Sequence, residues 1–175
     1  MSQSSHSVTA KIRHVRTAEQ LDGIRNLFRE YANWLGVCLC FQSFEQELAA
    51  LPGAYHSPDG GLWLATLDGA WVGCVGVKPL GDNRCELKRL YVKPEFQNRG
   101  IGKALLFEAL KFASRQDYSD IVLDTLERLK PALCLYHSVG FRPVAPYYDN
   151  PNEGVVYLGL KLDRFKFKTD YSNEH

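Results

Sequence analysis

The residues best suited to chemistry lie where an apolar strand pattern gives way to a loop with two glycines. The spacing Gln97-x-x-Gly100-x-Gly102 leads from that strand into a segment of helical periodicity. The first backbone N–H groups of a helix have no partner within it, and the helix dipole adds positive potential there. The glycines let an anion approach the backbone closely, and Arg99 and Lys103 add positive charge. The pattern predicts a diphosphate site; the alternative is a helix start whose glycines serve only a turn.

A second stretch, Tyr136-x-x-x-Gly140-Phe141, follows downstream. Together with the spacing from Gln97 to Gly102, it resembles the acyl-CoA signature of the GNAT superfamily of N-acetyltransferases. The order of elements matches this family from residue 11 to about residue 162. The resemblance implies acetyl-CoA as co-substrate, no metal, and a pantetheine arm held where two parallel strands part.

The resemblance also assigns cofactor contacts along the strand end and the loop. The residues concerned are Leu90, Tyr91, Val92, Gln97, Asn98, Arg99, Gly100, Ile101, Gly102 and Lys103. Leu87 and Leu90 stand an odd number of positions apart, although Leu90 and Val92 continue an alternating apolar face. A β-bulge near Arg89 restores that register, whereas burial of both strand faces is the alternative. Leu129 stands where many relatives have an asparagine that contacts the cofactor arm, so that contact is lost or replaced.

Glu86 and Tyr136 are the candidate catalytic residues. An alkylammonium must lose a proton before its nitrogen attacks a thioester, and Glu86 can accept that proton directly or through water. The alternatives are a structural pairing of Glu86 with Lys88 or Arg89, or a water chain without a dedicated base. By resemblance, Tyr136 points to the CoA sulfur and protonates the leaving thiolate. The alternative for Tyr136 is a ring that packs and a hydroxyl that only binds CoA.

The acceptor site is predicted from aromatic and acidic side chains near the first helices and the last strands. Tyr31, Trp34, Tyr147 and Asp149 suit an amine, because a cation binds over ring faces beside a counter-ion. Core packing is the alternative for each aromatic residue. A second possibility is recognition of a carboxylate by basic residues, namely Arg84, Lys88, Arg89 and Arg142.

The sequence is compatible with two mechanisms and two functions. Direct attack of a primary amine on acetyl-CoA in a ternary complex is the main hypothesis, with a small molecule, an amino acid or a peptide as acceptor. A covalent route through Cys85 or Cys134 is weaker, because no matched histidine is evident. A non-catalytic acyl-CoA-binding regulatory module is the alternative function, because the cofactor loop alone serves that role.

The periodicity predicts an α/β (α+β) domain, with a mixed, mainly antiparallel sheet of about seven strands and about four flanking helices. The expected strands are Lys11–Arg16, Leu62–Leu67, Trp71–Val77, Cys85–Val92, Ile121–Leu123, Phe141–Tyr147 and Val155–Leu162. The expected helices are Ala18–Leu35, Phe44–Leu51, Gly100–Ser114 and Pro131–Val139. The strand–helix–strand unit between residues 85 and 123 makes two parallel neighbours, which splay at the cofactor site.

Length and charge set the remaining expectations. The 175 residues, 45% of them hydrophobic, predict one domain over residues 11–162, a disordered leader over 1–10 and a polar tail over 163–175. A net charge of +1 disfavours nucleic acid, and no apolar run suits a membrane span. The five cysteines suit reduced thiols and a cytoplasmic location. A homodimer is a further expectation from the resemblance.

Overall fold

The computed structural model describes residues 9–40 and 43–163, and within them the chain forms one seven-stranded sheet in the order β1-β2-β3-β4-β5-β7-β6. The strands are β1 (Lys11–His14), β2 (Gly61–Leu67), β3 (Ala70–Gly81), β4 (Arg84–Val92), β5 (Asp120–Leu126), β6 (Arg142–Pro143) and β7 (Val155–Lys161). The helices are α1 (Ala18–Leu35), α2 (Phe44–Ala50), α3 (Ile101–Arg115) and α4 (Lys130–Val139). This mixed α/β architecture confirms the predicted fold class.

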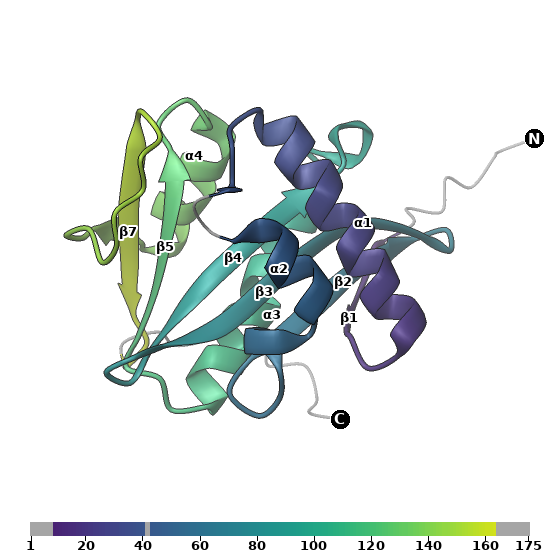
Figure 1. The fold of residues 1–175 in the computed structure, drawn as a ribbon, viewed down its shortest axis with the longest axis horizontal. Coiled ribbons are helices and arrows are strands. Elements are labelled where there is room, and N and C mark those ends of the chain that lie inside the picture. The colour runs from purple at the N-terminus through teal and green to yellow at the C-terminus, as the bar shows by residue number, and fades with distance from the viewer. Residues whose placement is uncertain (1–8, 41–42, 164–175) are drawn as a thin grey trace, which may run out of the picture.

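Two hydrophobic clusters lie on opposite faces of the sheet. Helices α1 and α2 cover the face that is in front in Figure 1, and α3 lies behind the sheet. The cluster behind also includes residues of α4, among them Tyr136. Every strand pair is antiparallel except β4 and β5, which are parallel and joined through α3. The predicted crossover unit is therefore present.

Local sequence signals explain the ends of α1 and the first hairpin. Thr17 and Gln20 form a capping box, in which each side chain accepts a hydrogen bond from the backbone N–H of the other. Gly36 ends the helix in the left-handed conformation at φ +68°. Asp68 and Gly69 both have positive φ, as a two-residue turn between β2 and β3 requires.

Strand β4 contains a β-bulge, in which two of its residues face a single residue of β3. Val75 of β3 stands opposite two residues, Arg89 and Leu90, and Arg89 takes the left-handed conformation at φ +60°. As a result, Leu87 and Leu90 both pack into the cluster behind the sheet. The register predicted from the leucine spacing is confirmed.

Several predicted boundaries are wrong. The strand expected over Phe141–Tyr147 shrinks to Arg142–Pro143. The Val144 N–H still donates to the Tyr157 carbonyl, but Pro146 has no N–H with which to continue the pairing. Strand β3 extends to Gly81 and β5 to Leu126, beyond the apolar runs that predicted them. The first eight residues of the expected leader, and the expected tail from residue 164 onward, lie outside the described residues.

The cysteines also depart from expectation. Cys38 and Cys40 form a disulfide just after α1, with Cα atoms 5.4 Å apart, within the range that a disulfide spans. Cys74 and Cys85 are buried thiols as expected, whereas Cys134 is exposed. Within the part of the chain that the structure describes, no helix has the length and apolar character needed to cross a bilayer.

Candidate active site

The parallel strands β4 and β5 part halfway along their length. Their pairing covers three residue pairs and ends where Glu86 faces Val122. Beyond that point β5 continues to pair with β7 as far as Leu126, whereas β4 remains paired only with β3. The edge of β4 from Leu87 to Val92 and the facing edge of β5 are thus open to a ligand.

The loop after β4 presents unpartnered amides at the start of α3. Asn98 and Gly100 have φ of +61° and +78°, so the chain turns twice before the helix begins. The first backbone bond into the helix runs from the Ala104 N–H to the Gly100 carbonyl. Among the described residues, the N–H groups from Gly100 to Lys103 have no acceptor. Unpartnered amides at a helix start are the donors that the predicted anion site requires.

Side chains fix this loop to the strand that precedes it. Gln97 donates from Nε2 to the carbonyl of Val92 at 3.0 Å, which ties the loop to the end of β4. The Arg99 guanidinium lies over the Phe96 ring, 5.4 Å from its centroid. Gln97 therefore acts on the loop through its side chain, while its neighbours offer backbone amides.

Tyr136 lies on α4 and is only 6% exposed. Its ring contacts the ring of Phe141, with centroids 5.6 Å apart. Burial raises the pKa of the Tyr136 phenol well above its ordinary value, and the charge of Asp124 on β5 raises it further. Tyr136 consequently stays a neutral hydrogen-bond donor at neutral pH.

Glu86 is buried on β4 at the point where the two strands part. It is 3% exposed and accepts a hydrogen bond from the Tyr147 hydroxyl at 2.9 Å. The ammonium groups of Lys88 and Lys78 lie 3.4 and 3.6 Å from its carboxylate oxygens. Of the two structural partners considered from sequence, Lys88 contacts Glu86, whereas Arg89 pairs with Glu47 on α2.

A polar network joins β4 to β5 across the opening. Lys88 lies 3.6 Å from Asp124, and Asp124 accepts hydrogen bonds from Tyr148 at 2.7 Å and Asn150 at 2.8 Å. Sequence reasoning missed Asp124, because the apolar run that predicted β5 ended one residue earlier. An aspartate directly after such a run was the available signal.

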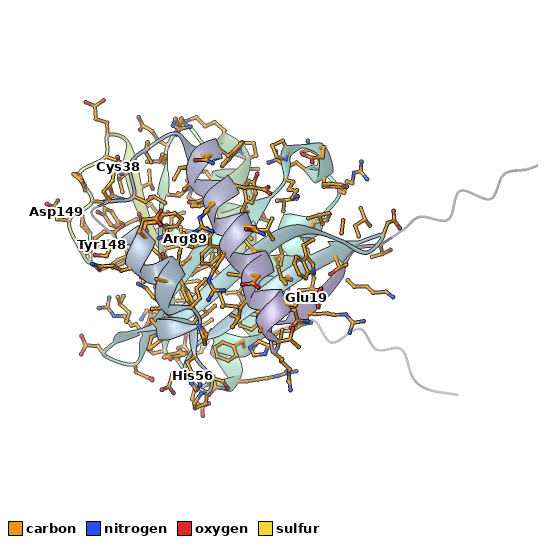
Figure 2. The ribbon with its side chains drawn as sticks, turned by 45° about the vertical axis from the view of Figure 1, so that its right-hand side comes forward. Glu19, Cys38, His56, Arg89, Tyr148 and Asp149 are labelled. Atoms are coloured by element: carbon orange, nitrogen blue, oxygen red, sulfur yellow. A yellow bond between two sulfur atoms is a disulfide. The ribbon has the colours of Figure 1, made fainter. Side chains whose placement is uncertain are left out.

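A cavity of about 520 Å³ lies beside Glu86, and its size suits a small-molecule ligand. Its walls come from α2 and the turn after it, from β3 and β4, and from the loop that carries Tyr147 and Tyr148. Figure 2 shows Tyr148 and Arg89 on the side of the sheet that α2 covers, with Asp149 farther out at the edge. A narrower cleft of about 40 Å³ lies between β4 and β5.

The four predicted acceptor residues do not converge on one place. Tyr147 lines the larger cavity and Tyr31 the narrower cleft. Trp34 is 43% exposed and packs against Tyr91, with ring centroids 5.8 Å apart. Asp149 is exposed at the molecular edge. The cavity thus brings Tyr147, but not Trp34, beside Glu86.

Other groups weighed from sequence also have defined positions. Leu129, in place of the cofactor-arm asparagine, lines the narrower cleft together with Thr125. Burial raises the pKa of the Cys85 thiol well above its ordinary value, which disfavours the nucleophilic thiolate. Across residues 9–40 and 43–163, no cluster of three or more His, Cys, Asp or Glu side chains is arranged to hold a metal.

Two parallel strands part above a glycine-turned helix start, and a buried tyrosine lies on the following helix, as the resemblance to N-acetyltransferases implies. The model of the Acetyltransferase (GNAT) family matches residues 21–141, and the chain belongs to this family. An uncharacterized N-acetyltransferase of Schizosaccharomyces pombe is 39% identical over 167 residues, which cover 94% of this chain and 99% of that protein.

Solved structures agree on the fold. A GNAT-family acetyltransferase from Staphylococcus aureus has a TM-score of 0.73 at 21% identity, covering 88% of this chain and 99% of that one. The PaiA N-acetyltransferase from Thermoplasma acidophilum, solved in complex with coenzyme A, has a TM-score of 0.67 at 23% identity, covering 87% and 99%. The chain is therefore an N-acetyltransferase of GNAT fold.

Proposed function

We propose that this protein transfers the acetyl group of acetyl-CoA to a primary amine by direct attack in a ternary complex. The observation that carries the proposal is the opening between β4 and β5, which begins at the buried carboxylate of Glu86. The amine of a small molecule, an amino acid or a peptide enters from the 520 Å³ cavity on the α2 side.

The cofactor residues named from sequence have the donors that an acyl-CoA needs. The unpartnered amides from Gly100 to Lys103 hold the diphosphate, and the open edge of β4 at Leu90, Tyr91 and Val92 pairs with the pantetheine arm. Acyl-CoA use is supported by the coenzyme A complex of the Thermoplasma acidophilum neighbour. The reaction needs no metal, because the thioester is itself an activated acyl group.

Three groups of this chain divide the chemistry. Glu86 accepts a proton from the incoming ammonium, directly or through a water, so that the nitrogen lone pair becomes available. A backbone N–H at the bulge, from Leu90 or Tyr91, donates to the thioester carbonyl oxygen as negative charge develops there. Tyr136, kept neutral by burial, donates its proton to the departing sulfur.

The test is release of free CoA from acetyl-CoA in the presence of a panel of amines, amino acids and peptides. We expect release that depends on both the protein and a primary amine, with binding of CoA to the protein measured in parallel. Tight CoA binding without turnover of any amine would contradict the proposal. It would support the non-catalytic acyl-CoA-binding module instead.

A further inference from the structure

The β4 bulge concentrates positive charge on the wall of the larger cavity. Because Arg89 is the extra residue of the bulge, it lies on the same face of the sheet as Lys88. Lys78, paired in register with Glu86 on the neighbouring strand, adds a third cation to this wall. Lys88 and Arg89 are only 7% and 6% exposed.

One of these cations has an unused donor. Arg89 donates from Nη2 to Oε2 of Glu47 at 2.7 Å, while the Tyr55 hydroxyl donates to the other oxygen, Oε1. Both Glu47 oxygens thus already accept a hydrogen bond. Within residues 9–40 and 43–163, Arg89 Nε is buried and has no acceptor. A buried guanidinium N–H without an acceptor is unfavourable, and a ligand oxygen relieves it.

The cations of this wall already lie near carboxylates. Arg89 pairs with Glu47, Lys78 and Lys88 lie near Glu86, and Lys88 also lies 3.6 Å from Asp124. The feature that calls for an anionic oxygen from the ligand is the unused N–H of Arg89, and the partly exposed ammonium of Lys78 lies on the same wall.

We infer that the acceptor carries a carboxylate besides its amine, as a free amino acid does. The carboxylate is held by Arg89 and Lys78, and the amine lies beside Glu86. This inference rests on the proposed acetyl transfer and adds the substrate class. The other basic residues considered from sequence are directed elsewhere: Arg84 lies 4.0 Å from Asp82, and Arg142 donates to the carbonyls of His137 and Phe141.

The experiment compares matched acceptors at saturating acetyl-CoA. Each series contains an amino acid, its carboxamide and the corresponding decarboxylated amine, and several side-chain types are assayed. In the series that the enzyme prefers, we expect kcat/KM for the amino acid to exceed both analogues by roughly 10- to 100-fold, because charge-assisted hydrogen bonds are lost. Amides or plain amines used equally well or better would overturn the inference and leave acetyl transfer intact.

Two variants test whether Lys78 and Arg89 bind the acceptor carboxylate. Lys78→Gln removes a partly exposed ammonium, and Arg89→Lys keeps a cation against Glu47 while removing Nε. Each should reduce the preference for the amino acid by about tenfold or more through KM of the acceptor, with KM of acetyl-CoA unchanged. Arg84→Gln, on the same strand but outside the cavity wall, is the matched control. A preference unchanged in both test variants would contradict the assignment, and absence of turnover with every amine would overturn the proposed function and this inference together.

Discussion

Tyr136 and Glu86 are both buried but have different neighbouring groups. The Tyr136 phenol is buried, and both desolvation and the charge of Asp124 raise its pKa, so the phenol is neutral and its O–H is a hydrogen-bond donor. Glu86 is equally buried but has two ammonium groups within 3.6 Å and a tyrosine hydroxyl as donor. One residue is suited to giving a proton and the other to accepting one.

Replacing Tyr136 with phenylalanine removes the donor and keeps the ring that packs against Phe141. We expect kcat to fall by roughly 10²- to 10⁴-fold, the range for loss of a general acid. Steady-state kinetics and a direct binding measurement with CoA separate this effect from affinity, which should change far less. An unaltered kcat would remove Tyr136 as the acid.

Replacing Glu86 with glutamine keeps the shape and the contact with Tyr147 but removes the base. We expect the variant to lose roughly 10²-fold or more in kcat and to show a flatter rise of rate with pH than the wild-type enzyme. The pH profile of kcat/KM is the measurement, with Glu108→Gln on the far helix α3 as the control. A pH profile identical to that of the wild type would assign proton removal to water or another group.

At the scale of elements, one bulge and one loop organise the site. The bulge at Arg89 places two successive side chains, Lys88 and Arg89, on the cavity wall and frees the backbone of β4 from β5. The loop turns through Asn98 and Gly100, which both have positive φ, just before the unpartnered amides at the start of α3. Both features depend on residues in the left-handed conformation.

A substitution at Gly100 tests the cofactor role of the loop, because its φ of +78° is unfavourable for any residue with a Cβ. Gly100→Ala should cost about 1–2 kcal/mol of loop stability and raise KM of acetyl-CoA about tenfold. Gly69→Ala, in the β2–β3 turn at φ +81°, carries a similar strain far from the site and serves as the control. Denaturant unfolding and KM should separate the two variants. Equal effects on KM would contradict a cofactor role for the loop.

How far the sequence predicted these elements differs from place to place. The spacing of Leu87 and Leu90 located the bulge, because an inserted residue shifts the alternation along a strand by one position. Short-range patterns also predicted the loop. They did not predict the end of β5 or the short β6, because strand length there depends on which neighbour supplies hydrogen bonds. The disulfide between Cys38 and Cys40 likewise depends on loop geometry.

The candidate site was predicted less completely than the fold. Tyr136 belongs to the Tyr-x-x-x-Gly-Phe stretch and Glu86 to an apolar strand pattern, so their elements were evident. The cavity wall joins β3, β4, α2 and the late loop, which lie far apart along the chain. Contacts such as Arg89 with Glu47, or Lys88 with Asp124, follow from packing and leave no short-range signature.

Across the whole molecule, buried tyrosine hydroxyls make the free energy of unfolding depend on pH in the alkaline range. Tyr55 and Tyr136 are 3% and 6% exposed, and burial raises the pKa of each above the ordinary value of 10.0. The unfolded chain therefore releases these protons first as the pH rises. Their contribution to stability is complete below pH 10.0 and is lost above it, by about 1.4 kcal/mol per pH unit for each group.

Urea unfolding at a series of pH values measures this dependence. We expect the free energy of unfolding to fall progressively above about pH 10. In Tyr136→Phe the slope should be shallower by about 1.4 kcal/mol per pH unit, the share of one tyrosine. An unchanged slope in the variant would contradict the burial of the Tyr136 proton. The proposed mechanism transfers this same proton to the departing sulfur.

Direct acetyl transfer is tested most simply by a quenched reaction of enzyme, acetyl-CoA and an amine acceptor, in which mass spectrometry follows both protein and amine. Direct attack predicts N-acetylated amine and free CoA in equal amounts, an unmodified protein at every time point, and no product from acetyl-CoA when the protein is omitted. An acetylated protein that forms before the product and decays into it, or CoA bound without any acetylated amine, would contradict transfer at the opening between β4 and β5.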